Sequence, residues 1–326
     1  MKLTECFIRI YNSKLPQIMK ISLIGICESI RNIFTFNSRK KIFEIEFANE
    51  EINVVITGGN KGIGKEITLL LVKHNYNVHI LARDKSSLEE IKYYCDKIQK
   101  NKCFYTECDL SNPRSIKSAA STVFKNKKIH LIINNAGILE PSIKYRNNIE
   151  INFFINHLGH FILFKELERR ICAIRGRVVN VTSCAIYSVD EYFTAKNPFF
   201  SFMKLYSESK LCNSLFSLAI KNMSGIRSVA IHPGIIATNL FDRSFYGYFV
   251  WLTTKLASRF LVTTQEAANV VINACFTHEI YSENEKCDLF IGYDKGIIPK
   301  SLNVDNSRKL WNLSEYLYQK LERNDD

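Results

Sequence analysis

The feature of this sequence that most constrains its fold is a short apolar strand followed by a glycine-rich turn and a helical pattern. The apolar run Asn53–Ile56 continues into Thr57-Gly58-Gly59-Asn60-Lys61-Gly62-Ile63-Gly64, and Gly62–His74 has helical periodicity. Glycine is needed where a chain turns tightly and where its backbone must approach a pyrophosphate. A helix N-terminus supplies unpaired N–H groups and the positive end of its dipole. This order predicts a dinucleotide-binding turn; an ordinary strand-to-helix connection is the simpler alternative.

Short apolar runs alternate with helical patterns along most of the remaining chain. Further strands are expected at 77–82, 102–106, 129–133, 177–181 and 228–231, and helices at 85–97 and 113–124. Fully apolar strands that alternate with helices imply a parallel sheet covered on both faces. We therefore predict an α/β fold with a Rossmann-type doubly wound sheet, whose ligands bind at the carboxyl ends of the strands.

The composition changes near residues 43–51, which predicts an N-terminal extension (1–48) and one domain (49–326). The extension mixes apolar residues with bases. Its longest charge-free apolar run, Ile21–Cys27, is far shorter than the ~20 residues that span a bilayer, and no small-residue cleavage site follows it. A basic amphipathic helix can lie in the membrane interface. We expect peripheral membrane association here, with packing on the protein's own surface as the alternative.

The formal net charge of +12 favours contact with anions such as nucleic acid, anionic lipid or a phosphorylated cofactor. Nucleic acid is set aside because no basic–aromatic motif accompanies the charge. The ten cysteines include no CxxC pair and no zinc-ligand spacing. We therefore expect no metal site, and scattered single cysteines are typical of a reducing compartment.

The end of the second predicted strand bears on the choice between NAD and NADP. An acid at this position holds the ribose 2′-hydroxyl of NAD, whereas a base accommodates the 2′-phosphate of NADP. Arg83 ends this strand and Lys61 lies in the glycine turn, so NADP(H) is preferred. Asp84 follows immediately and keeps NAD(H) open as the alternative.

Further motifs follow in order along the chain. They are Cys108-Asp109-Leu110, Asn134-Asn135-Ala136-Gly137, a helix that carries Asn156, Asn180-Val181-Thr182-Ser183, Tyr206-Ser207-Glu208-Ser209-Lys210 and His232-Pro233-Gly234-Ile235-Ile236-Ala237-Thr238. A YxxxK pair alone is common by chance, and each of the other motifs alone is weak evidence for a family. Together with the Gly-x-x-x-Gly-x-Gly turn, in this order, they make residues 52 to 240 resemble the short-chain dehydrogenase/reductase family.

The chemistry of hydride transfer explains the residue types in these motifs. A free tyrosine has a pKa of about 10, too high for an efficient base near neutrality. Lys210 lies one helical turn after Tyr206 on the same face, and its charge would lower that pKa. By resemblance, Ser183 orients the substrate oxygen, and the spacing in family sequences favours it over Thr182. Asn156 would position a water that links Lys210 to solvent.

The resemblance also implies a set of cofactor-binding residues. Asp109 would contact the adenine, and Lys210 would hold the nicotinamide ribose. The full set is Gly58, Asn60, Lys61, Gly62, Ile63, Gly64, Arg83, Asp109, Asn135, Ala136, Gly137, Tyr206, Lys210, Pro233, Gly234, Ile236 and Thr238. His157 and His160 lie on a helix beside Leu158 and Phe161, so we expect them to be packed or hydrogen-bonded rather than metal-bound.

Several motif details resemble the retinol dehydrogenase-like branch of the family. They are NKGIGKE, LARD, NHLGHF, NVTS, YSESKL and HPGIIATNL. The N-terminal extension and the segment around Leu310-Trp311 are similar to polyprenol dehydrogenase-like members. The resemblance implies an NADP(H)-dependent oxidoreductase for a lipophilic alcohol and its aldehyde or ketone, of retinoid, steroid or polyprenoid type. It also implies an intracellular protein at the endoplasmic reticulum membrane or lipid droplet, with the cytosol as the alternative, and a homodimer as one option.

The segment after Asn239 is rich in large apolar residues and would cover the substrate by resemblance. These residues are Phe241, Phe245, Tyr246, Tyr248, Phe249, Val250, Trp251 and Leu252. They suit an apolar pocket or a membrane-facing entrance, although ordinary core packing is the alternative. A soluble carbonyl reductase for small substrates is a second hypothesis. A catalytically silent NADP-binding regulator is a third, disfavoured because Tyr206, Lys210, Ser183 and Asn156 are all present.

Overall fold

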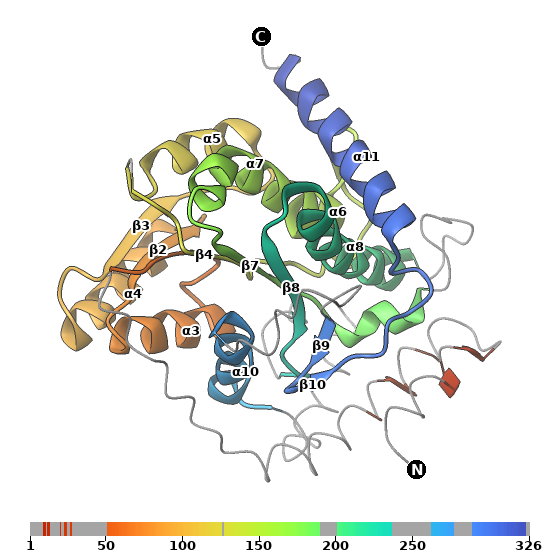
Figure 1. The fold of residues 1–326 in the computed structure, drawn as a ribbon, viewed down its shortest axis with the longest axis horizontal. Helices are drawn as coiled ribbons and strands as arrows, with labels where there is room; N and C mark the ends of the chain where they lie inside the picture. The colour runs from red at the N-terminus through yellow and green to blue at the C-terminus, as the bar shows by residue number, and fades with distance from the viewer. Residues whose placement is uncertain are drawn as a thin grey trace.

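The computed structural model describes residues 51–125, 127–189, 201–236, 262–276 and 289–323, together with a few residues of the N-terminal segment. Its centre is an eight-stranded sheet with the order β10-β9-β8-β7-β4-β1-β2-β3 (Figure 1). The strands are β1 (Asn53–Thr57), β2 (Asn77–Ala82), β3 (Cys103–Glu107), β4 (Leu131–Asn134), β7 (Arg177–Val181), β8 (Arg227–His232), β9 (Leu289–Ile291) and β10 (Asp294–Lys295). Neighbouring strands are parallel except the terminal pair of β9 and β10. The predicted doubly wound sheet is confirmed.

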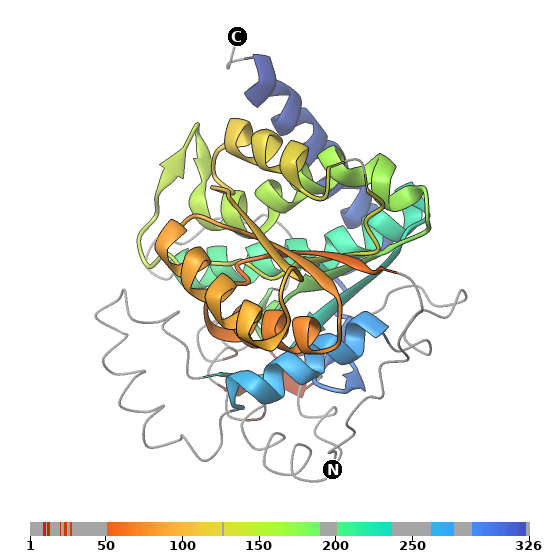
Figure 2. The same cartoon turned by 90° about the vertical axis from the view of Figure 1, so that its left-hand side faces the viewer.

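Two layers of helices enclose this sheet (Figure 2). One face packs against α3 (Gly62–Lys73), α4 (Lys85–Ile98) and α10 (Thr264–Phe276). The other face packs against α5 (Pro113–Thr122), α7 (Gly159–Cys172) and α8 (Ser201–Ser224). The last helix, α11 (Val304–Arg323), lies against α8. Because both faces are covered, the central strands are buried along their length and mostly apolar, as in NVVIT of β1.

The chain reverses its direction of travel across the sheet between β1 and β4. β1 pairs with β2 on one side and with β4 on the other, both in parallel. In open α/β sheets, ligands bind at the carboxyl ends of the strands where the strand order reverses in this way. The residues at the carboxyl ends of β1 and β4 are therefore the ones that the fold places at the expected ligand site.

Between β4 and α7 the chain forms a small hairpin and an irregular helix. The hairpin pairs β5 (Tyr145–Arg146) with β6 (Ile149–Glu150), and α6 (Ile151–Phe153) leads into the π-helical turn η1 (Phe154–Leu158). Glu150 accepts hydrogen bonds from the backbone N–H groups of Asn152 and Phe153, which fixes the start of α6. A π-helical turn inside a helix is rare and recurs at functional sites.

Three described apolar residues of the N-terminal segment are buried in the protein. Ile10, Ile24 and Cys27 join a cluster with Tyr187 and Leu211, among others. For these residues the structure therefore favours the packing alternative. Among the described residues, no helix is both long and apolar enough to cross a membrane.

Candidate active site

The glycine turn between β1 and α3 has the shape that a bound phosphate group requires. Gly58 and Gly62 have φ angles of +65° and +54°, which favour glycine. A Cβ on Gly64 would lie 2.1 Å from the carbonyl oxygen of Gly58, so no side chain fits there. At Gly62 a Cβ would meet nothing within 4 Å, so open space lies above the turn.

The N-terminus of α3 faces this space without a side-chain cap. Lys61 is the N-cap residue, it makes no capping hydrogen bond, and the first turn of α3 contains no acid. The backbone N–H groups and the positive end of the helix dipole remain for an anion. These residues fit the pyrophosphate of a dinucleotide.

Lys61, Arg83 and Asp84 come close together beside the turn. The Lys61 ammonium lies 2.6 Å from a carboxylate oxygen of Asp84, and both side chains are exposed. This hydrogen bond is the main reason that the pKa of Asp84 lies well below its usual range. Asp84 is therefore ionised, and its negative charge offsets the positive charge of Lys61. Lys61 is one of the two bases that the sequence analysis assigned to the 2′-phosphate of NADP. Arg83 is exposed at the end of β2.

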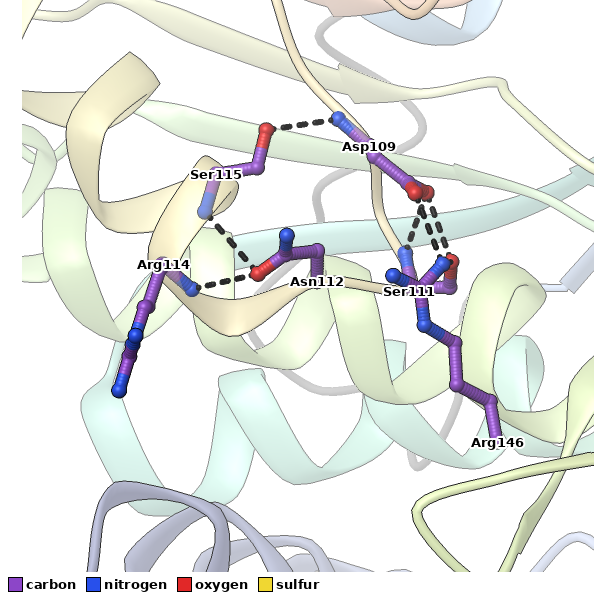
Figure 3. A network of polar contacts seen from close by, with 6 residues as sticks. All are labelled: Asp109, Ser111, Asn112, Arg114, Ser115 and Arg146. Carbon is purple, nitrogen blue, oxygen red and sulfur yellow. Dashed lines mark hydrogen bonds and ion pairs between the residues drawn. The ribbon is translucent and has the colours of Figure 1, made fainter. Parts of the chain in front are cut away.

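Asp109, after β3, lies in a polar network that includes a residue from the β5–β6 hairpin (Figure 3). Its carboxylate accepts hydrogen bonds from the Ser111 backbone N–H at 2.9 Å and hydroxyl at 2.7 Å. Arg146 pairs with the other carboxylate oxygen at 2.9 Å and donates to the Ser111 hydroxyl at 2.6 Å. Burial would raise the pKa of Asp109, but the hydrogen bonds from Ser111 and the charge of Arg146 outweigh it and lower that pKa.

The turn Asn135-Ala136-Gly137 follows β4 and lies beside the glycine turn. The Thr57 hydroxyl accepts hydrogen bonds from the backbone N–H groups of Asn135 and Ala136, each at 3.0 Å. The Asn135 amide donates to the carbonyl oxygens of Thr57 at 3.0 Å and Gly58 at 3.3 Å. The two turns are therefore fastened to each other.

Tyr206, Lys210 and Ser183 are brought together by α8 and the end of β7. Tyr206 and Lys210 lie one turn apart on α8 and are both buried, with the Lys210 ammonium 5.8 Å from the centre of the Tyr206 ring. The Ser183 side chain, just beyond β7, interacts with that of Tyr206 and lowers its pKa, against the larger effect of burial. Lys210 also donates to the Val181 carbonyl at 3.3 Å.

Asn156 lies in the π-helical turn η1. It is hydrogen-bonded to Ile138, which directly follows the Asn135-Ala136-Gly137 turn that Thr57 holds at its start. Its side-chain oxygen accepts from the Ile138 N–H at 2.7 Å, and its amide donates to the Ile138 carbonyl and the Ser209 hydroxyl, each at 2.9 Å. A Cβ on Gly137 would lie 3.0 Å from the Lys210 ammonium and 3.3 Å from the Asn156 oxygen. Gly137 thus lets the chain pass between these two side chains.

Burial controls the protonation of this group. It raises the pKa of Tyr206 above its usual value, and the interaction with Ser183 offsets only part of this. Burial also lowers the pKa of Lys210 to about 8. Without a ligand, Tyr206 is therefore protonated near neutral pH. Lys210 loses its charge as the pH rises through about 8, close to neutrality.

The motif after β8 is described only in part. Pro233, Gly234 and Ile236 are buried, and Gly234 has a φ of +108°. Ile236 pairs with Val262, which fixes this segment next to α10. Thr238 and the apolar segment 241–252 lie outside the described residues.

Sequence reasoning missed several residues that support the site. Thr57, His160 and Ser209 hold the turn and Asn156, and Arg146 pairs with Asp109. His160 is packed and hydrogen-bonded, as the sequence predicts, but its partners are not evident from the sequence. Two signals in the sequence point to these contacts. Thr57 directly precedes the glycine turn, and in NHLGHF His160 follows Asn156 by four residues, about one helical turn. No comparable signal pointed to Arg146.

Comparison with known proteins places this geometry in a family. A family model described as short chain dehydrogenase matches residues 52–247, more than half of the chain. Retinol dehydrogenase 12 of Bos taurus is 31% identical and covers 80% of this chain and 84% of its own. Retinol dehydrogenase 11 of Homo sapiens is 29% identical and covers 92% and 91%. The crystal structure of an uncharacterized protein from Mycobacterium Paratuberculosis has a TM-score of 0.60 at 25% identity and covers 84% of this chain and 94% of that one.

The order of the motifs, the fold and these relatives agree with one another. The fold and the fit of the glycine turn are those of a nicotinamide-binding protein, and the relatives act on an alcohol group. The chain belongs to the short-chain dehydrogenase family, in its retinol dehydrogenase-like branch, and is an oxidoreductase that acts on CH–OH groups with a nicotinamide cofactor.

Proposed function

We propose that this protein interconverts a lipophilic alcohol and its aldehyde or ketone with NADP(H), and that Tyr206 is the general acid and base. The observation that carries the proposal is the convergence of Tyr206, Lys210, Ser183 and Asn156 around the turn that ends in Gly137. A buried tyrosine that interacts with a serine, beside a buried lysine, is suited to moving a proton at a substrate oxygen.

In the reductive direction Tyr206 donates its hydroxyl proton to the substrate oxygen. The bound cofactor supplies the hydride that the carbonyl carbon accepts. The Ser183 hydroxyl donates a hydrogen bond to the same oxygen and orients it, which keeps the carbonyl within reach of Tyr206. In the oxidative direction Tyr206 accepts the alcohol proton instead.

Lys210 and Asn156 support the proton on Tyr206. A charged Lys210 stabilises the phenolate that forms when Tyr206 releases its proton, and it also holds the nicotinamide ribose. The Asn156 side-chain oxygen accepts a hydrogen bond from the Ile138 N–H, and its second lone pair can accept another. We assign to Asn156 the water that returns a proton to Lys210.

The remaining cofactor residues divide by position. Gly58, Asn60, Lys61, Gly62, Ile63 and Gly64 would hold the pyrophosphate, Asp109 the adenine, and Asn135, Ala136 and Gly137 the middle of the molecule. Pro233, Gly234 and Ile236 would line the nicotinamide. The Asn60 amide donates to the Ser87 hydroxyl at 2.6 Å, which ties the glycine turn to the start of α4 beside it.

A lipophilic substrate is supported by the branch to which the chain belongs. The two relatives named above are called retinol dehydrogenases, and retinol is a lipophilic alcohol. The apolar composition of 241–252 agrees with such a substrate.

A panel of carbonyl substrates tests this function. Purified full-length protein is supplied with all-trans-retinal, a steroid ketone, a polyprenal or 4-nitrobenzaldehyde, each with NADPH and NADH, and nicotinamide absorbance is followed. We expect the highest kcat/KM with one of the lipophilic compounds and NADPH, and the alcohol as the product by chromatography. Preference for the nitrobenzaldehyde would favour the small-carbonyl hypothesis, and cofactor binding without any turnover would favour the silent regulator.

The preference for NADP(H) is proposed from Arg83 and Lys61, and Arg83→Ala tests it. Losing a charged hydrogen bond to the 2′-phosphate is expected to raise the Kd for NADPH about 10- to 100-fold. The Kd for NADH, which lacks this phosphate, should change less than about threefold. Both constants are measured by the fluorescence of the reduced nicotinamide.

Lys73→Ala is the matched control for Arg83→Ala. Lys73 lies in the last turn of α3, at the opposite end of this helix from Lys61, and its loss changes the net charge equally. It should leave both dissociation constants unchanged. An Arg83→Ala protein that keeps the wild-type ratio of NADPH to NADH affinity would refute the assignment of Arg83.

We further propose that residues 1–48 bind peripherally to the surface of the endoplasmic reticulum membrane or of a lipid droplet. They precede a catalytic domain of residues 49–326. Since Ile10, Ile24 and Cys27 pack on that domain, the bases of the segment carry the attraction. Replacing Arg31, Arg39, Lys40 and Lys41 with Gln is expected to abolish most flotation with vesicles that contain phosphatidylserine. Equal flotation of both proteins would remove this anchor.

A further inference from the structure

His160 occupies a place in the fold that links the two halves of the site. It lies in the first turn of α7, four residues after Asn156, and is 1% exposed. One ring nitrogen, Nδ1, is 2.9 Å from the Asn156 carbonyl oxygen, and the other, Nε2, is 2.8 Å from the Thr57 hydroxyl. Asn156 and Thr57 are 99 positions apart in sequence by their numbers, so only the fold brings them to one imidazole.

The partners of His160 determine which nitrogen carries the proton. A carbonyl oxygen can only accept, so Nδ1 must be the N–H that donates to Asn156. The Thr57 oxygen already accepts from the N–H groups of Asn135 and Ala136, so its own proton is left for Nε2. Nδ1 must therefore carry a proton and Nε2 must have a free lone pair, and only the neutral ring protonated at Nδ1 meets both conditions.

Burial keeps the ring in this neutral form. It lowers the pKa of His160 to about 4, the hydrogen bond to the Asn156 carbonyl opposes this, and the nearby charge of Lys210 adds to it. The ring therefore does not titrate in the pH range in which the protein would work. Its role follows from its hydrogen bonds and not from proton transfer.

The consequence is a turn held at both ends by one helical segment. Thr57, itself held by His160, fixes the N–H groups at the start of the turn, Asn135 and Ala136. The Asn156 side chain fixes its end at Ile138. His160 also binds the backbone of Asn156, so one imidazole sets the relative positions of the cofactor-lining turn and Asn156.

We propose that His160 is a positioning residue for the reaction: its neutral ring aligns the cofactor-lining turn through Thr57 and Asn156 through the backbone carbonyl. This inference rests on the function proposed above. It predicts two separable effects, because one nitrogen serves the turn, and hence cofactor affinity, and the other serves Asn156, and hence the proton path.

Amide substitutions separate the two nitrogens. The amide of His160→Asn lies near the position of Nδ1 and can still donate to the Asn156 carbonyl, but it cannot reach Thr57. The longer His160→Gln can still accept from Thr57 near the position of Nε2, but it loses the bond to Asn156. His160→Leu removes both bonds and keeps an apolar side chain of similar size.

Cofactor affinity and turnover are measured on the three full-length variants. The Kd for NADPH, taken from nicotinamide fluorescence without substrate, is expected to rise about tenfold in His160→Asn and His160→Leu but less than about threefold in His160→Gln. The value of kcat at saturating NADPH is expected to fall about tenfold in His160→Gln and His160→Leu but not in His160→Asn.

Ser314→Ala is the control for a purely structural effect. The neighbouring buried His157 is bonded through Nε2 to the Ser314 hydroxyl of α11 at 2.8 Å, away from the turn. Its loss should lower the melting temperature and leave Kd and kcat within about twofold. The proposal is overturned if His160→Asn and His160→Gln each lose NADPH affinity and kcat together, in proportion to the fall in their melting temperatures. It is also overturned if neither variant changes in affinity or in kcat.

The cofactor measurement also separates this inference from the proposed function. If the wild-type protein binds NADPH but turns over no compound of the panel, the proposed function fails. The Kd values of the Asn, Gln and Leu variants then still decide whether His160 aligns the turn.

Discussion

Tyr206→Phe is expected to lower kcat for carbonyl reduction by about 10²- to 10⁴-fold, because the substrate oxygen loses its proton donor. The ring of Tyr206 is buried and phenylalanine keeps it, so the fold and the walls of the site should persist. The Kd for NADPH should therefore stay within about threefold of the wild-type value. Steady-state reduction of the preferred substrate, with NADPH fluorescence as the binding assay, measures both quantities.

Tyr318→Phe is the matched control for this substitution. Tyr318 is also buried, but it lies on α11 and its hydroxyl donates to Glu166 on α7. Its replacement removes one buried tyrosine hydroxyl without touching the site, so stability should fall and kcat should not. Retention of full turnover by Tyr206→Phe, with the control equally active, would contradict the role assigned to Tyr206.

Lys210→Met is expected to produce the second large loss, about 10²-fold or more in kcat/KM for NADPH. The substitution removes the charge that stabilises the phenolate of Tyr206 and the group assigned to the nicotinamide ribose. Methionine fills a similar volume without a charge that must be desolvated, so the free energy of unfolding should not decrease. A loss of activity together with unchanged or higher thermal stability therefore separates function from folding.

The pH dependence of the wild-type protein tests the same residue. The pKa of Lys210 is lowered to about 8, so its charge is present below that pH and lost above it. In the reductive direction, kcat/KM for NADPH should therefore fall as pH rises through about 8. The raised pKa of Tyr206 keeps this residue protonated throughout, so it adds no limb between pH 6 and about 9. Lys210→Met should lack the limb near pH 8, and a variant that retained it would assign the limb to another group.

The central sheet could be predicted from the sequence because its signal is local. Each parallel strand is buried on both faces and reads as an apolar run, and the predicted strands lie within two residues of β1, β2, β3, β4, β7 and β8. The short strands β9 and β10 and the β5–β6 hairpin were not predicted. With two or three residues each, they are too short to show a periodicity.

The candidate site could be predicted where one motif lies at one strand end. Tyr206 and Lys210 share a helix face by their spacing alone, and the glycine turn lies between its strand and helix. The protonation of Tyr206 and Lys210 could not be derived in this way, because it depends on burial by distant segments. Sequence reasoning expected Lys210 to lower the pKa of Tyr206; without a ligand, burial dominates and raises it.

Supporting contacts across the sheet required the fold itself. His160 follows β4 by more than twenty residues and reaches Thr57 only because the fold places the first turn of α7 beside the end of β1. Arg146 reaches Asp109 from a hairpin whose existence was not anticipated (Figure 3). Neither residue belongs to a motif whose spacing predicts its partner.

The transfer of deuterium from cofactor to product tests the central claim most directly. The wild-type protein is incubated with NADPH deuterated at C4 of the nicotinamide, in separate preparations labelled on each face, and with the preferred lipophilic carbonyl compound. The account predicts that one preparation yields an alcohol with one deuterium on its carbinol carbon, and that Tyr206→Phe forms this product far more slowly. An unlabelled alcohol from both preparations, or equal rates of labelled product from the two proteins, would contradict it.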